Sequence, residues 1–175
     1  MSEEARAEDK AHARDDAGET TDRKAAGDDQ KVTGTRTSRG EAETFALGER
    51  FGARLAGGEI VLLDGALGAG KTVFVKGLAR SLGVDPAEVT SPSFTLVNRH
   101  DEGRLTLYHL DLYRLDEGAS AAHAVDLEEL LADERAVVVI EWAERMKNYR
   151  LPPPVFRVSI SGDGEEPRAI TIRSG

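Results

Sequence analysis

The sequence predicts an α/β fold: a P-loop NTPase-like three-layer domain with a mixed, mainly parallel central sheet and antiparallel additions. The first observation is an apolar run, residues 59–64, followed by the glycine-rich stretch GALGAGKT at residues 65–72 and a helical pattern of apolar residues. The second is a fully apolar run at residues 136–140 that leads into the acidic Glu141. A strand, a glycine-rich loop and a helix in this order are typical of a phosphate-binding domain. Buried strands that alternate with helices favour a sheet covered on its faces.

The chain divides into a charged tail and one folded domain. It has 175 residues, and residues 1–31 contain no Val, Ile, Leu, Phe, Tyr or Trp. A segment with nothing to bury gains too little from becoming ordered to offset its loss of conformational entropy. We therefore predict a disordered, charged N-terminal tail at residues 1–33 and a P-loop ATPase domain at residues 34–175. A charged tethering arm for a partner is the alternative reading of the tail.

Composition excludes several classes of protein. The chain has no cysteine, so disulfides and thiolate metal sites are impossible. Its net charge of −9 argues against general nucleic-acid binding through a basic surface. No apolar run approaches the ~20 residues that a membrane span needs, and the chain does not begin with a signal-peptide pattern. We expect a cytoplasmic protein without a membrane partner.

The remaining elements follow from hydrophobic periodicity and turn signals. A helix is predicted at residues 41–55, with Ser38 as its N-cap and Glu41 three residues later. The helix after the glycine-rich loop is predicted to stop at Gly83. The other predicted elements are a short strand at 32–36, a hairpin of strands at 94–99 and 105–113, a short helix at 125–132, a strand at 136–141, and a hairpin of strands at 155–161 and 168–172 around residues 162–164.

The stretch GALGAGKT has the spacing of the P-loop, G-x-x-x-x-G-K-[ST]. Its glycines allow several backbone N–H groups to point at one anion. Lys71 would place a positive charge on the β- and γ-phosphates of a nucleotide, and the hydroxyl of Thr72 would hold Mg²⁺. The alternative is a flexible Gly/Ala turn without a ligand.

The second chemical element is the strand that ends at Glu141. A buried strand ending in a carboxylate beside a P-loop strand is the Walker B arrangement, in which the acid faces the metal. Nucleotide sites in open α/β sheets lie at the carboxyl ends of strands, which is where Glu141 falls. The alternative is an exposed carboxylate at the end of a core strand. Trp142, the only tryptophan, is either a stacking surface or part of the core.

The third element is Asp111, in the stretch YHLDLYRL. Strand alternation places His109, Asp111 and Tyr113 on one face. A carboxylate near a strand end suits the positioning of water or an indirect contact with a metal, and the alternative is an ordinary amphipathic strand. We interpret His109 as a satisfied polar residue rather than a catalyst, and Arg114 as a surface ion pair rather than an arginine finger.

Five motifs follow one another along the chain: GALGAGKT, SPSFTLV at 91–97, LYHLDLYRL at 107–115, VVVIEWAE at 137–144 and LP at 151–152. In this order they resemble the bacterial TsaE family, small P-loop ATPases of tRNA threonylcarbamoyladenosine biosynthesis. The resemblance implies an ATPase that uses ATP and Mg²⁺ and has low turnover alone. It also implies that the protein works with the TsaD–TsaB heterodimer, which transfers a threonylcarbamoyl group to adenosine 37 of tRNA. Hydrolysis would reset that complex between cycles, and tRNA would be contacted only through the partners.

The resemblance also assigns residues. It makes Lys71, Asp111 and Glu141 catalytic, and it places Mg²⁺ on Thr72 and Glu141. Residues 91–95 become a switch-like loop near the γ-phosphate. The nucleotide-binding residues that it implies, with Glu41 and Thr44 near the base, are Glu41, Thr44, Gly65, Gly68, Ala69, Gly70, Lys71, Thr72, Val73 and Trp142.

Two other functions stay open at this point. A small-molecule kinase also uses a P-loop, but it needs an acceptor pocket and usually a lid that carries arginine. We read the segment between Gly83 and the strand at 136–141 as strands rather than a helical lid. A non-hydrolysing nucleotide switch would keep Lys71 and Thr72 but would not need Asp111.

Overall fold

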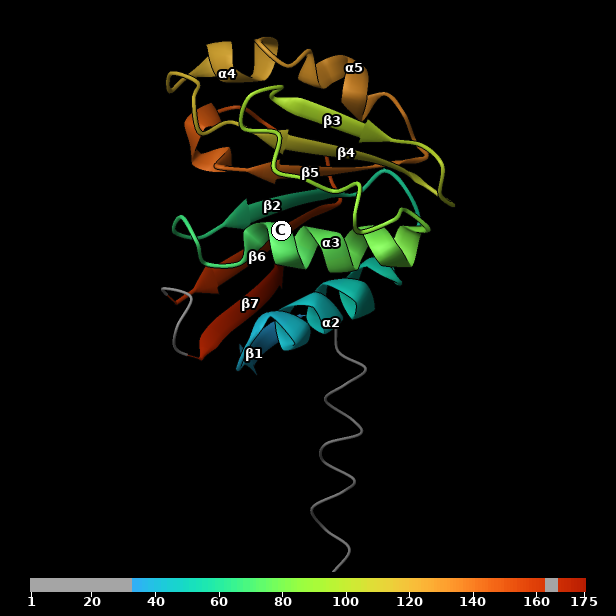
Figure 1. Ribbon diagram of the computed structural model, residues 1–175. Helices are drawn as coiled ribbons and strands as arrows, with labels where there is room; N and C mark the ends of the chain where they lie inside the picture. The colour runs from blue at the N-terminus through green and yellow to red at the C-terminus, as the bar shows by residue number, and fades with distance from the viewer. Residues whose placement is uncertain (1–32, 163–166) are drawn as a thin grey trace, which may run out of the picture. The chain divides into compact units, whose positions relative to one another are not determined.

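The structure is a computed structural model that describes residues 33–162 and 167–175 (Figure 1). The tail predicted at residues 1–33 lies outside the described residues except at its last position. Most of the turn predicted around residues 162–164 also lies outside them.

Within the described ranges, seven strands form one sheet: β1 (Gly34–Ser38), β2 (Ile60–Asp64), β3 (Val97–His100), β4 (Thr106–Asp111), β5 (Ala136–Glu141), β6 (Val155–Ser161) and β7 (Arg168–Ser174). Their order across the sheet is β1-β7-β6-β2-β5-β4-β3. The four central strands, β6, β2, β5 and β4, run parallel, whereas β3, β7 and β1 add antiparallel pairings at the two sides. The predicted mixed sheet, with a parallel centre and antiparallel additions, is confirmed.

Helices cover both faces of this sheet. They are α2 (Glu41–Gly52), α3 (Lys71–Leu82), α4 (Ala119–His123), α5 (Leu127–Leu131) and the 3₁₀ helix η1 (Ala143–Met146). Strand alternation divides the core: Val137 and Val139 of β5 lie in one apolar cluster with α2 and α3, and Val138 and Ile140 lie in another with α4, α5 and η1. In Figure 1, α2 and α3 lie side by side, and in the other helical layer α4 contacts α5 and η1, while α5 contacts β5. The domain therefore has the three predicted layers.

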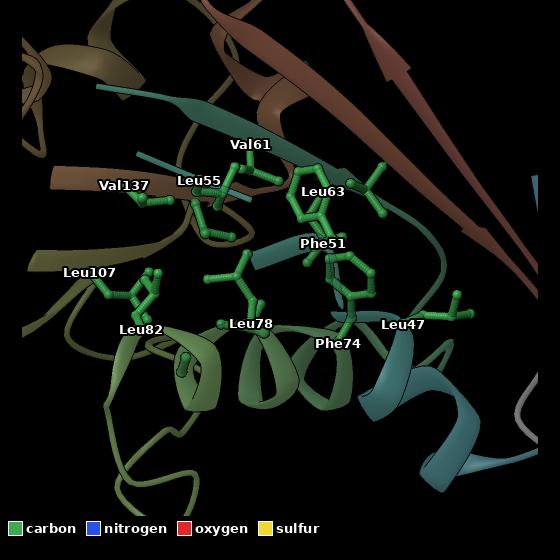
Figure 2. Close-up of a cluster of buried hydrophobic side chains, with 14 of the residues drawn as sticks. Leu47, Phe51, Leu55, Val61, Leu63, Phe74, Leu78, Leu82, Leu107 and Val137 are labelled. Atoms are coloured by element: carbon green, nitrogen blue, oxygen red, sulfur yellow. The ribbon is translucent and has the colours of Figure 1, made fainter. Parts of the chain in front are cut away.

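The first core cluster fixes α3 on the sheet. Phe74, Leu78 and Leu82 recur every four residues along α3 and are fully buried. Figure 2 shows them pointing toward strand residues such as Val61 and Val137. Because α3 begins directly after the glycine-rich loop, this packing also holds the loop at the carboxyl end of β2.

The helices α2 and α3 approach each other through two glycines. A Cβ atom built on Gly77 of α3 would overlap the backbone carbonyl of Phe45, and one on Gly48 of α2 would overlap that of Phe74. Such contacts leave no room for a side chain, because the atoms in the way belong to the backbone of the opposite helix.

We expect the substitution Gly77→Ala to destabilise the domain. Alanine favours a helix over glycine by about 0.5–1 kcal/mol, but overpacking against a backbone costs about 1–3 kcal/mol or more. The cost of the clash should exceed the gain in helix propensity and lower the melting temperature by up to about 10 °C, measured by circular dichroism. Gly40→Ala is the comparison variant without a clash: a Cβ at Gly40 meets no atom within 4 Å, so this variant has only the smaller cost of alanine at the N-cap of α2. A rise in melting temperature for Gly77→Ala would contradict the close approach of the two helices.

Several element boundaries differ from the prediction. Ser38 is not the N-cap of α2: it is the last residue of β1, and Gly40 takes the N-cap position. The hydroxyl of Ser38 donates instead to the carbonyl of Gly40 at 2.8 Å, so the predicted capping box is wrong. The same helix ends at Gly52 rather than at residue 55. Residues 94–96 are outside β3, since Leu96 takes a positive φ of 65° that a strand does not allow.

The segment between β4 and β5 contains two helices, of which the sequence predicted one. The helix predicted at residues 125–132 is present as α5, but α4 was not predicted. Both helices have five residues, but α4 (ASAAH) contains no large apolar residue that could mark a helical period, whereas α5 (LEELL) contains three leucines. None of the helices within residues 33–162 and 167–175 is long and apolar enough to cross a membrane.

Candidate functional site

The glycine-rich loop joins β2 to α3 as the sequence predicts. Gly70 is the residue before α3 and has a φ of 102°, a left-handed conformation that side chains disfavour. This conformation lets α3 begin at Lys71, so the free N–H groups of its first turn face the loop. Such a helix N-terminus favours an anion through both its N–H groups and its dipole.

The side chain of Lys71 folds back onto its own loop. Its ammonium donates hydrogen bonds to the carbonyl oxygens of Gly65 at 2.9 Å and Ala66 at 3.1 Å. It also lies 4.6 Å from the centre of the Trp142 ring, a cation–π distance. Only 6% of the residue is exposed. The loop therefore holds a nearly buried positive charge.

Glu141 provides the opposite charge. It ends β5 and is 3% exposed, so the exposed-carboxylate alternative is wrong. One carboxylate oxygen, Oε2, lies 3.9 Å from the Lys71 ammonium, and the other, Oε1, lies 2.9 Å from Nε2 of His109. A buried carboxylate is tolerated when it is paired and hydrogen-bonded in this way.

Asp111 ends the neighbouring strand β4, directly opposite Glu141 in the parallel register. It is 2% exposed, and its Oδ2 accepts hydrogen bonds from the hydroxyls of Ser91, at 2.9 Å, and Ser93. Its Oδ1 accepts the backbone N–H of Tyr113 at 2.9 Å. The carboxylate thus ties the loop of residues 91–95 to the end of β4.

These elements enclose one cleft of about 390 Å³. It is lined by Glu41, Leu67, Gly68, Gly70, Lys71, Thr72, Val73, Ser91, Ser93, Asp111, Tyr113, Glu141, Trp142 and Arg168. Three of the predicted nucleotide-binding residues do not line it. Gly65 contributes its carbonyl to Lys71, and Ala69 is buried in the core cluster beneath α3. Thr44 is fully buried behind the cleft wall.

Arg168 and Thr44 form part of a buried polar chain. The Nη1 of Arg168 donates to the Thr44 hydroxyl at 3.4 Å, and that hydroxyl is 2.8 Å from the Ser38 hydroxyl. A ligand in the cleft would therefore meet Arg168, and Thr44 only through it. Sequence reasoning did not single out Arg168, which begins β7 far from the other motifs and lies in no local pattern.

Three further residues, Tyr113, His109 and Arg114, make contacts that the sequence did not predict. Tyr113 was noted only as a neighbour of Asp111, but it lines the cleft with its ring centre 5.0 Å from that of Trp142. Strand alternation places His109 on the same face as Asp111. That shared face is the one sequence feature that points to the contact of His109 with Glu141. Arg114 lies over the exposed ring of Phe94, with its guanidinium carbon 4.3 Å from the ring centre.

The oxygen atoms in the cleft suit Mg²⁺. The Thr72 hydroxyl and the carboxylates of Asp111 and Glu141 all line it, and hard oxygen ligands are those that Mg²⁺ prefers. Over the described ranges, the chain holds no group of three or more His, Cys, Asp or Glu residues arranged to bind a metal ion.

The parallel centre of the sheet, with the glycine-rich loop between β2 and α3, defines a P-loop NTPase-like domain. The sequence pattern of the family described as "Threonylcarbamoyl adenosine biosynthesis protein TsaE" matches residues 38–170. The chain belongs to the TsaE family, and it is a protein of tRNA threonylcarbamoyladenosine biosynthesis.

Individual relatives agree with this assignment. The chain is 42% identical to the Treponema pallidum tRNA threonylcarbamoyladenosine biosynthesis protein TsaE, over 77% of this chain and 96% of that protein. It is 41% identical to the TsaE protein of Mycobacterium tuberculosis, over 73% and 82% of the two chains. A crystal structure of Bacillus subtilis YdiB superposes with a TM-score of 0.64 and 30% identity, covering 81% of this chain and 85% of that one.

Proposed function

We propose that this protein is a Mg²⁺-dependent ATPase that acts on the TsaD–TsaB heterodimer during the N6-threonylcarbamoyl modification of adenosine 37 in tRNA, and that it supports multiple turnovers of that pair. The observation that carries the proposal is the convergence of Lys71, Thr72, Asp111 and Glu141 on one cleft at the carboxyl ends of parallel strands. Ligands of open α/β sheets bind at that edge.

The residues of the cleft would have different roles in ATP hydrolysis. The Lys71 ammonium, now held by two carbonyl groups of its own loop, would turn to the phosphates, where a negative charge replaces neutral acceptors. Thr72 and Glu141 would hold Mg²⁺, which supplies positive charge to the phosphate oxygens when bound. Asp111, beside Glu141 in the register, is placed to orient the attacking water.

The hydrogen bonds of Asp111 suggest how hydrolysis could be communicated to a partner. Ser91 and Ser93 both donate to its Oδ2, so any change at this carboxylate changes what holds the loop of residues 91–95. A loop held in one nucleotide state and released in another gives two surfaces with different affinity for a partner.

The two alternative functions fit the cleft less well. A kinase lid should close over the nucleotide, but α4 and α5 pack in the second core cluster, on the face of the sheet opposite α3. A non-hydrolysing switch would not need a buried carboxylate at the position of Asp111.

We propose that the partner pair, rather than this protein, holds the tRNA. The net charge of −9 disfavours direct binding, because neutralisation of phosphates supplies most of the affinity of a protein for nucleic acid. We also propose that the protein acts in the cytoplasm.

We expect TsaD–TsaB to raise the ATP turnover of this protein at least about tenfold, which corresponds to a decrease of about 1.4 kcal/mol in the activation free energy. ATP should also tighten the assembly relative to no nucleotide, and by linkage the partner pair must then raise the affinity for ATP by the same factor. Turnover with purified partners and pull-downs with and without ATP measure both effects. Turnover with small-molecule acceptors, added without TsaD–TsaB, tests the kinase alternative.

The proposal fails if the pair neither binds nor stimulates the protein. It also fails if TsaD–TsaB, supplied with its own substrates, modifies tRNA to completion over many cycles in the absence of this protein.

A further inference from the structure

The buried imidazole of His109 contacts the cleft only through Glu141. His109 lies in β4 with an exposed fraction of 0%, and its Nε2 is 2.9 Å from Oε1 of Glu141. It is not among the residues that line the cleft. A carboxylate only accepts hydrogen bonds, so Nε2 carries the hydrogen and donates it.

Burial of the His109 imidazole has a free-energy cost, which arises at its other ring nitrogen. Nδ1 of His109 is buried and has no hydrogen-bond partner among the described residues. Leaving a buried polar group unsatisfied costs about 1–3 kcal/mol. Leu107, two residues earlier on the same face of β4, fills its place in the core without such a group. What His109 adds over a leucine is therefore the N–H that it presents to Glu141.

Glu141 needs that N–H most when a nucleotide is bound. Its two contacts within the described ranges are the Lys71 ammonium at Oε2 and His109 at Oε1. If Lys71 turns to the phosphates, Oε2 loses its cation while Oε1 keeps its hydrogen bond. A group that stays on Oε1 fixes the plane of the carboxylate and leaves Oε2 directed at the cleft.

We propose that His109 is a positioning residue, which holds Glu141 in the orientation that receives Mg²⁺ and acts on the metal only through that carboxylate. The inference rests on the proposed function, because it assumes that nucleotide and Mg²⁺ bind in this cleft.

The test compares nucleotide affinity with and without the metal. Calorimetry gives the Kd of the full chain for AMP-PNP in EDTA and in Mg²⁺, and the ratio of the two values is the gain from the metal. In His109→Leu we expect this gain to fall about tenfold, since loss of a group that orients a metal ligand typically costs 10–100-fold. The Kd in EDTA should stay within about twofold, because the phosphate cradle is untouched.

Two further variants separate positioning from packing. His109→Gln carries an N–H donor close to the place of Nε2, and it should restore the gain to within about threefold of the wild type. His100→Leu is the matched control. His100 lies on the neighbouring strand β3, with its Nε2 buried and unpartnered among the described residues, but its Nδ1 faces Glu102 at 3.8 Å, and it does not line the cleft. It should leave the gain unchanged. His109→Phe serves as the second variant without a donor at this position if the leucine variant does not fold.

Three results would overturn the inference while leaving the proposed function intact. The first is an unchanged gain from Mg²⁺ in His109→Leu, and the second is an equal fall of that gain in His109→Leu and His109→Gln. The third is a fall of the affinity in EDTA as large as that of the affinity in Mg²⁺. A wild-type chain that binds no AMP-PNP, with or without Mg²⁺, would overturn the proposed function and this inference together.

Discussion

Replacing Lys71 with alanine is expected to weaken ATP binding about 10–100-fold. A hydrogen bond to a charged group contributes about 1.5–3 kcal/mol, and each 1.4 kcal/mol is a factor of ten in Kd. The ammonium is already at the cleft and nearly buried, so the phosphates would meet it with little competition from water. Isothermal calorimetry with ATP and Mg²⁺ gives the change directly.

The variant needs a control, because Lys71 also has a structural role in the nucleotide-free loop. Its removal leaves the carbonyls of Gly65 and Ala66 without their donor and the ring of Trp142 without its cation. Lys76→Ala removes a lysine from the same helix, outside the residues that line the cleft, and should bind ATP as the wild type does. Unchanged ATP affinity in a folded Lys71→Ala protein would count decisively against the P-loop reading.

The parts of the fold that could be predicted from the sequence are those with a local cause. The strand β5 was predicted with its observed bounds, because six consecutive buried residues leave a continuous apolar run that ends at Glu141. The helix α3 was predicted because its buried residues recur every four positions before Gly83. The N-cap residue of α2 could not be predicted from such a local pattern. Ser38 has the right residue type and spacing for an N-cap, but tertiary pairing draws it into β1.

The same distinction applies to the candidate site: residues in local motifs could be predicted, and residues brought in by strand pairing could not. Lys71, Thr72 and Glu141 stand in local motifs, so their presence in one cleft could be expected from the order of strand, loop and helix. Arg168 reaches the cleft only because β7 pairs with β6, beside the P-loop strand, and no residue near it in the sequence signals that. The contact of His109 with Glu141 joins residues 32 positions apart. It depends on β4 and β5 being neighbours, which alternation within one strand does not reveal.

The second large effect is expected from Glu141→Gln, which keeps the shape of the side chain and removes its charge. ATP hydrolysis should fall by at least about 100-fold, because the variant loses a charged ligand of the proposed Mg²⁺ site, and a bound metal stabilises the charge of the transition state by several kcal/mol. Nucleotide binding in EDTA should survive, because Glu141 is an acid and repels phosphate rather than attracting it. The measurement is ATP turnover with TsaD–TsaB present, together with the Kd in EDTA. Glu144→Gln is the control, since Glu144 is an exposed acid three residues later in η1.

Asp111→Asn should lower turnover as well, but for a separate reason that the structure makes testable. The asparagine oxygen can still accept hydrogen bonds from the loop hydroxyls, whereas the amide that replaces the other oxygen is a donor and cannot accept the N–H of Tyr113. The variant therefore loses the charge that we propose orients water, together with part of the link between β4 and its following turn. If hydrolysis depends on both carboxylates, each variant turns ATP over far more slowly than the wild type, while Glu144→Gln keeps the parent rate. The contradicting result is ATP turnover at the wild-type rate in both Glu141→Gln and Asp111→Asn, measured with the partners present. Neither carboxylate would then have the proposed role, and the cleft would be left without an assigned catalytic carboxylate.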